Sequence, residues 1–231
     1  MSAIRGARER ARTEVTAAIK EEARSQLARE GAAKLSLRAV ARELGMVSSA
    51  LYRYFPSRDD LLTALIVDAY DALGAAAEAA LAETDGREPG ERWGAVCRAV
   101  REWALAHPHE YALIYGSPVP GYSAPQDTVV PASRVGLALL AVAGEAHAAG
   151  TLRVPGESEV PEAVRADARA LAATLGTGLP DAALAAFIAA WAQLFGLVSF
   201  ELFGQFNNVV EAREEFFAQA VAGLGRTVGL P

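Results

Sequence analysis

Apolar residues recur every three or four positions along almost the whole chain, and no long stretch alternates apolar with polar residues. In the first segment Val15, Ile19, Ala23 and Leu27 are spaced four apart, so they share one face of a helix. Of the 231 residues, 52% are hydrophobic, which is enough to bury a sizeable core. The spacing therefore predicts an all-α protein.

Glycine, proline and capping residues mark where these helices begin and end. Gly31 and Gly45 can end the first two helices, and Ser36 is a good N-cap for the second. Ser57, followed by Asp60 three residues later, forms a capping-box pattern for the fourth. After the first helix we expect a second over about residues 36–44 and a short third that starts near residue 48. The later expected helices span about residues 58–83, 92–106, 108–116, 127–149, 162–175, 180–203 and 209–224.

Charge is distributed unevenly along the chain. Residues 1–60 contain 12 basic and 8 acidic residues, a net charge of +4, whereas the remainder has 10 and 20, a net charge of −10. A basic end on an acidic body indicates that this end meets a polyanion. The basic residues include an N-terminal arm with Arg5, Arg8, Arg10 and Arg12. We expect this arm either to contact that polyanion or to be disordered.

Two further features bear on the cellular compartment. The single cysteine, Cys97, makes no intrachain disulfide and fits a reducing cytosol, where we expect it to be a small buried residue. Residues 182–200 have no charge and are long enough to span a bilayer. They are alanine-rich, however, and lie between Asp181 and Glu201 without a basic anchor. We interpret them as a buried interface helix, with a helix that tethers the protein to a membrane as the alternative.

The second and third helices, joined by a turn at Gly45, form a helix-turn-helix pattern. Val47, Leu51 and Phe55 are spaced four apart, so we expect them to pack against the second helix. The opposite face then presents Ser48, Ser49, Tyr52 and Arg53. Hydroxyls and a guanidinium suit phosphate oxygens and the major-groove edges of bases. The alternative is a solvated helical hairpin that binds no DNA.

The stretch SLRAVARELGMVSSALYRYFPSRDDLL resembles the N-terminal domain of the tetracycline-repressor (TetR) family. The likeness covers about residues 14–68. It rests on Leu-Gly at the end of the second helix, a small-residue turn, Ala-Leu-Tyr-x-x-Phe, and Pro-Ser-basic-acidic-acidic-Leu-Leu. The resemblance implies a helix-turn-helix DNA-binding domain at 1–57, followed by a larger helical regulatory and dimerisation domain at 58–231.

The resemblance also implies a function. It indicates a cytoplasmic homodimeric transcriptional regulator, usually a repressor, that binds a palindromic operator and is released by a mostly apolar small molecule. No cofactor, metal or membrane is implied. By the same resemblance, the residues expected to contact DNA are Ser36, Arg38, Ser48, Ser49, Tyr52, Arg53, Tyr54 and Arg58.

The stretches HPHEYALIYGSPVPGY and WAQLFGLVSFELFGQF resemble the regulatory domain of the branch of this family that is named for a Trp-His-Gly motif. Phe195 stands where that branch often has its histidine. The expected effector pocket is lined by Trp103, Tyr111, Tyr115, Tyr122, Phe187, Trp191 and Phe195. Residues 187, 191 and 195 also have the spacing of an ordinary core stripe.

The last two expected helices have more apolar surface than a monomer needs. By resemblance they form a four-helix dimer interface with their symmetry mates. The apolar residues concerned are Leu184, Ile188, Trp191, Leu194, Phe195, Val198, Phe203, Phe216, Phe217, Val221 and Leu224.

A metal-dependent enzyme is the competing class. His107, His109 and Glu110 form the only histidine cluster, and a metal site needs further ligands, for which His147 and Glu145 are the candidates. No phosphate-binding loop, nucleophile elbow or dinucleotide fingerprint is present. The sequence therefore favours a regulator over an enzyme.

Overall fold

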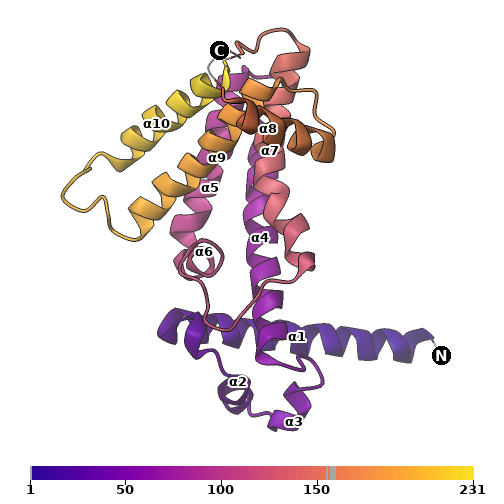
Figure 1. Cartoon of the computed structure of the whole chain (residues 1–231). Coiled ribbons are helices and arrows are strands. Elements are labelled where there is room, and N and C mark those ends of the chain that lie inside the picture. The colour runs from indigo at the N-terminus through magenta and orange to yellow at the C-terminus, as the bar shows by residue number, and fades with distance from the viewer. Residues whose placement is uncertain (1, 155, 157–159) are drawn as a thin grey trace. The chain divides into compact units, whose positions relative to one another are not determined.

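The structure, a computed structural model, describes residues 2–154, 156 and 160–231, and the side chains of residues 2–5 and 8 lie outside that description. Every regular element in the described residues is helical, as predicted (Figure 1). The elements are α1 (Ser2–Glu30), η1 (Ala32–Lys34), α2 (Leu37–Glu43), α3 (Ser48–Leu51), α4 (Arg58–Glu83), α5 (Pro89–Ala106), α6 (Pro108–Tyr115), η2 (Gln126–Thr128), α7 (Val129–Ala148), α8 (Glu162–Leu175), α9 (Asp181–Leu202) and α10 (Arg213–Val228).

Most helix bounds agree with the sequence prediction, but α10 is displaced by four residues from the expected 209–224. It starts later because the chain forms turns over residues 203–209, with Asn208 left-handed at φ 60°, and Ala212, directly before the helix, still has non-helical angles, φ −80° and ψ 65°. It continues past Gly225 because this glycine lets the Trp93 ring pack directly against the helix, and it does not end the helix. A Cβ there would lie 3.3 Å from Cδ1 of Trp93. The helix ends instead at Gly229, whose φ is 105°.

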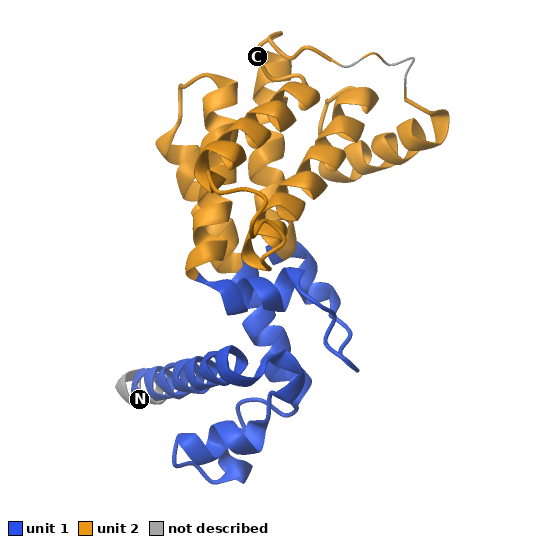
Figure 2. Cartoon of the chain, turned by 90° about the vertical axis from the view of Figure 1, so that its left-hand side faces the viewer, with its two compact units in different colours: residues 1–70, 107–131 blue, residues 71–106, 132–231 orange. Residues whose placement is uncertain are grey.

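The chain forms two compact units, coloured separately in Figure 2. Unit 1 contains residues 1–70 and 107–131, and unit 2 contains residues 71–106 and 132–231. The division between Tyr70 and Asp71 falls inside α4. These units are defined by packing, so the functional boundary predicted after residue 57 stays a prediction.

The core of unit 1 is built by the first four helices together. Ile19 of α1, Val40 of α2, Leu51 of α3 and Leu61 and Leu62 of α4 are all completely buried. Each such side chain contributes about 1.5–3 kcal/mol when it leaves water. Because α3 has only one turn, too short to be stable alone, its position depends on this packing. Truncation of Leu51 to alanine would cost about 2–5 kcal/mol.

The core of unit 2 is organised around Trp93 of α5. The indole Nε1 donates a hydrogen bond to the carbonyl of Val221 in α10, at 3.1 Å. The ring packs edge-on against Phe187 of α9, with centroids 6.3 Å apart. Cys97, one turn later, is fully buried as predicted, and burial raises the pKa of its thiol. Helices α5, α9 and α10 therefore share one core.

An arginine–glutamate pair joins α5 to α9 beneath α10. Arg101 Nε and Nη2 donate to the two carboxylate oxygens of Glu201, both at 2.7 Å. The side chains are only 14% and 6% exposed, and the guanidinium carbon lies 5.4 Å from the centroid of the Phe217 ring. The hydrogen bonds to Glu201 raise the pKa of Arg101, so this guanidinium stays charged inside the unit.

A second arginine joins α4 to α7. Arg134 donates to both carboxylate oxygens of Glu78, at 2.8 and 2.6 Å, and to Asp71 Oδ1 at 2.8 Å. Its side chain lies across Gly74, where a Cβ would approach the arginine Cβ to 2.6 Å. The absence of a side chain at Gly74 is therefore what lets Arg134 reach both carboxylates.

Candidate DNA interface and effector region

The helix-turn-helix of unit 1 is held by its turn and by its core. Gly45 has φ +64°, a conformation that favours glycine, and its N–H donates to the carbonyl of Arg42 at 3.1 Å. The N–H of Met46 donates to the carbonyl of Ala41 at 2.8 Å. With Leu51 inserted in the core, α3 is held against α2.

The residues predicted to face DNA lie mostly on the solvent side of this motif. Arg38, Ser49, Tyr52 and Arg53 are exposed, and Ser48 is half-buried. We call these five residues the reading surface. Within the described part of the chain, neither of its arginines forms an ion pair with a carboxylate. Both guanidinium groups are therefore available to an anion such as a phosphate.

Two other predicted DNA contacts have structural partners. Ser36 Oγ accepts a hydrogen bond from the N–H of Ala39 at 3.4 Å, so it caps α2 as predicted. Arg58 donates to the carbonyl of Leu35 at 3.2 Å and to that of Ala32 at 2.9 Å. It thereby satisfies carbonyls of the α1–α2 connection, a role that the sequence did not suggest. Contacts of Ser36 and Arg58 with DNA stay predictions.

The basic arm is the N-terminal part of α1, and its Arg12 contacts Tyr54, which directly follows Arg53 in the chain. The guanidinium carbon of Arg12 lies 5.6 Å from the centroid of the Tyr54 ring, within the range of a cation–π interaction. Arg10 is exposed and has no carboxylate partner among the described residues. The side chains of Arg5 and Arg8 lie outside the described part of the structure.

Val47 is not in the core, contrary to the prediction from its spacing with Leu51 and Phe55. Those two residues are 0% and 7% exposed, whereas Val47 is 71% exposed. It occupies the N-cap of α3 with extended backbone angles, φ −69° and ψ 137°. A helical period does not continue into a residue outside the helix, so its side chain is not directed at the core.

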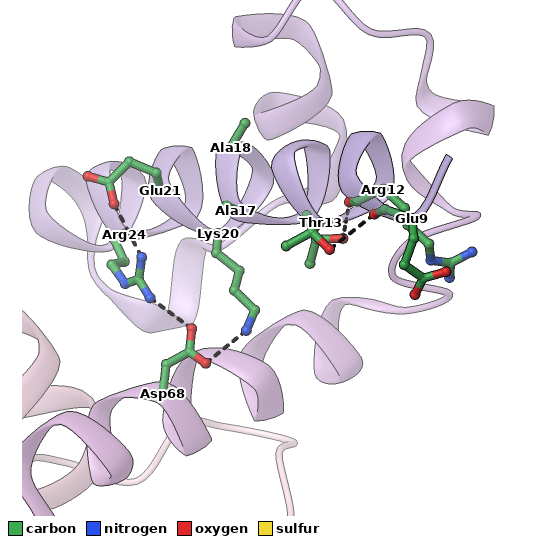
Figure 3. Close-up of a pocket in the computed structure, with 10 residues that line it drawn as sticks. Glu9, Arg12, Thr13, Ala17, Ala18, Lys20, Glu21, Arg24 and Asp68 are labelled. Carbon is green, nitrogen blue, oxygen red and sulfur yellow. Dashed lines mark hydrogen bonds and ion pairs between the residues drawn. The ribbon is translucent and has the colours of Figure 1, made fainter. Parts of the chain in front are cut away.

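Ion pairs in unit 1 join α1, α4 and α6. Asp68 of α4 accepts hydrogen bonds from Lys20 and Arg24 of α1, both at 2.8 Å. Arg24 Nε also lies 3.7 Å from the carboxylate of Glu110 in α6. Figure 3 shows Asp68 between the two cations, at one side of a groove of about 640 Å³ that extends along α1 to Arg12. The network connects α1 and α4, which pack against the helix-turn-helix, to α6.

Tyrosines cluster where α6 meets the first half of α4. The Tyr115 ring lies 5.2 Å from Tyr111 and 6.0 Å from Tyr70, which it meets edge-on. Tyr122 forms a 2.9 Å hydrogen bond with Thr63. Burial raises the pKa values of Tyr70 and Tyr115, so both phenols are neutral hydrogen-bonding groups. Tyr70 was not among the predicted effector residues, because it stood alone in its sequence segment.

The other four predicted effector residues belong to unit 2. Trp103, Phe187 and Phe195 are buried, whereas Trp191 is 36% exposed and meets Phe195 edge-on at 5.8 Å. The stripe at 187, 191 and 195 is therefore partly core and partly surface. That all seven residues line one cavity stays a prediction.

Comparison with known proteins decides the family. Residues 19–65 match the family described as "Bacterial regulatory proteins, tetR family", and residues 93–224 match "Tetracyclin repressor-like, C-terminal domain". HTH-type transcriptional regulators Mb1846 of Mycobacterium bovis and Rv1816 of Mycobacterium tuberculosis are each 42% identical over 203 residues, covering 87% of this chain and 86% of the relative. The chain belongs to the TetR family of bacterial transcriptional regulators.

Solved structures agree with the TetR fold. The regulatory protein SCO4313 is 37% identical and has a TM-score of 0.75, covering 94% of this chain and 97% of that one. PfmR, a TetR family regulator from Thermus thermophilus, is 21% identical, with a TM-score of 0.56 and coverage of 89% and 95%. RolR, solved with resorcinol, is 15% identical, with a TM-score of 0.53 and coverage of 96% and 97%. The last two show the fold alone.

Membership of the TetR family makes this chain a DNA-binding regulator and not an enzyme, as predicted. Within the described residues, no three His, Cys, Asp or Glu side chains gather in a way that would hold a metal ion. His107 is the N-cap of α6, and His109 is exposed in its first turn.

Helix α9 of this TetR regulator is apolar on both its buried and its exposed sides. Of the predicted dimer residues, Leu184, Leu194, Phe195, Val198, Phe217, Val221 and Leu224 lie in the core of the protomer. Ile188, Trp191, Phe203 and Phe216 are 36–43% exposed, and Phe200 is 52% exposed.

Residues 126–148 and α9 are long and apolar enough to cross a membrane, a test that buried helices of soluble proteins also pass.

Proposed function

We propose that the chain is a homodimeric repressor that binds a near-palindromic operator and is released by a small, mostly apolar effector. The observation that supports this best is the reading surface, where two arginines without a carboxylate partner stand beside hydroxyl groups. Guanidinium and hydroxyl groups bind phosphates and base edges. In this proposal α3 enters the major groove and α2 crosses the backbone, and the regulator acts in the cytoplasm.

The buried tyrosines of unit 1 are the proposed route from effector to operator. Tyr111 and Tyr115 lie on α6, which also holds Glu110 beside Arg24 of α1. An effector that changes the packing of these rings would shift α6 and, through Arg24 and Asp68, the helix-turn-helix. Such coupling is typically about 1–3 kcal/mol. Clustered aromatic rings that carry phenol hydroxyls favour an effector that is largely apolar, with one or two polar groups.

The dimer contact is proposed to use the exposed aromatic face of α9 and α10. Phe206 links Phe200 and Phe216, with ring centroids 5.8 and 5.5 Å away. Exposed aromatics in one patch are typical of an interface rather than of a free surface. We also propose that the body belongs to the branch named for the Trp-His-Gly motif, with Phe195 in place of the histidine.

The experiment is selection of bound duplexes from a random DNA library, followed by anisotropy titrations in rising salt. We expect a palindrome, bound by a species that light scattering shows to be a dimer. Arg53→Ala should lose preference at one base pair or show a shallower salt dependence. Arg87→Ala, an exposed arginine of unit 2, is the matched control and should bind like wild type. Weak binding without sequence preference would refute the proposal.

A further inference from the structure

Val47 is one of the most exposed apolar side chains in the described chain, and no core contact explains it. It is 71% exposed, next to Ser48 and Ser49 of the reading surface. Its carbonyl accepts the N–H of Ala50 at 2.9 Å, so the backbone is fixed by the first turn of α3. The isopropyl group is therefore held outward at the start of the helix proposed to enter the groove.

Valine is also an unfavourable residue at the N-cap of α3. An N-cap normally provides a side-chain oxygen for the N–H groups of the first turn, and valine has none. The structure accordingly has no side-chain cap at α3. A residue that is unfavourable for the local structure and is not buried in the core is expected where the protein contacts a partner.

The chemistry of the partner follows from where Val47 stands. Base edges in the major groove are polar, with one exception, the C5-methyl group of thymine. An apolar side chain among hydroxyls and guanidinium groups fits that methyl group and no other feature of the groove. We propose that Val47 specifies a thymine in each operator half-site by contact with its methyl group, an inference that rests on the proposed DNA-binding function.

The test removes the methyl group from the DNA and the side chain from the protein, separately and together. In the selected duplex, each thymine is replaced in turn by deoxyuridine, which lacks only that methyl. Wild type should lose about fourfold in affinity at one thymine per half-site, because the burial of one methyl group is removed. Val47→Ser should bind the thymine and deoxyuridine duplexes equally. Serine is a favoured N-cap, so this variant is expected to fold.

Controls separate this inference from the function on which it rests. Val164→Ser changes a valine of α8 that is 43% exposed in unit 2 and lies outside the proposed dimer patch, and should keep the wild-type response to deoxyuridine. A selected operator with no thymine whose methyl matters, or a Val47→Ser variant that still discriminates, overturns the role of Val47 and leaves the regulator standing. If no operator can be selected, the proposed DNA-binding function is itself refuted.

Discussion

Replacing Glu201 by glutamine tests how far burial decides the strength of an ion pair in this protein. The change removes one charge from a bidentate pair whose side chains are 14% and 6% exposed. Arg101 is then left charged in a site with little water. Breaking a buried pair in this way costs about 3–5 kcal/mol. For a chain of this size, that lowers the melting temperature by roughly 6–20 °C. Denaturant unfolding followed by circular dichroism, at one fixed protein concentration, measures the change.

Glu78→Gln is the matched control, because the Arg134–Glu78 pair has nearly the same geometry in a more exposed site, at 26% and 48%. It should cost less than about 1 kcal/mol. Equal losses for the two variants would refute the argument from burial. The hydrogen bonds from Arg134 lower the pKa of Glu78. The contribution of this ion pair to the free energy of unfolding is therefore present at neutral pH and is lost as pH falls through the lowered pKa.

Other predictions concern single positions. Gly74→Ala should destabilise unit 2 by about 1–3 kcal/mol, because its Cβ would collide with Arg134, and an unchanged denaturation midpoint would contradict this. Cys97 should resist thiol reagents at pH 8 until the chain unfolds, so rapid labelling of native protein would show that it is accessible. Arg12→Gln should reduce the slope of log affinity against log salt by about 0.9 for each DNA phosphate that the variant no longer neutralises, which titrations would measure. Tyr115→Leu should alter the effector response without weakening operator binding, and an unchanged response would exclude Tyr115 from the effector route.

Local patterns predicted the helices well, because spacing, caps and glycines act within a few residues of each other. The capping role of Ser36 and the burial of Cys97 are of this kind. The prediction for Val47 was wrong because an extended residue before a helix still matches the helical spacing. The structural role of Arg58 was missed because its carbonyl partners precede it by more than 20 residues.

Contacts between residues far apart in the chain were also not predicted from the sequence. Arg101 meets Glu201 across 100 residues, and nothing in either segment marks the other. Gly74 looked like an ordinary glycine in a helix until Arg134 was seen to lie across it. Tyr70 lies beside Tyr115 of α6 only because α4 and α6 pack together in the fold.

The continuity of α4 limits how this regulator can be re-engineered. A chimera that transplants only residues 1–57 would leave behind Leu61, Leu62 and Leu65, which complete the core of the helix-turn-helix. A graft that keeps unit 1 whole includes α4 as far as Tyr70 and also residues 107–131. That second segment contains the tyrosines proposed to sense the effector. No single splice point therefore exchanges operator choice while preserving the original sensing residues.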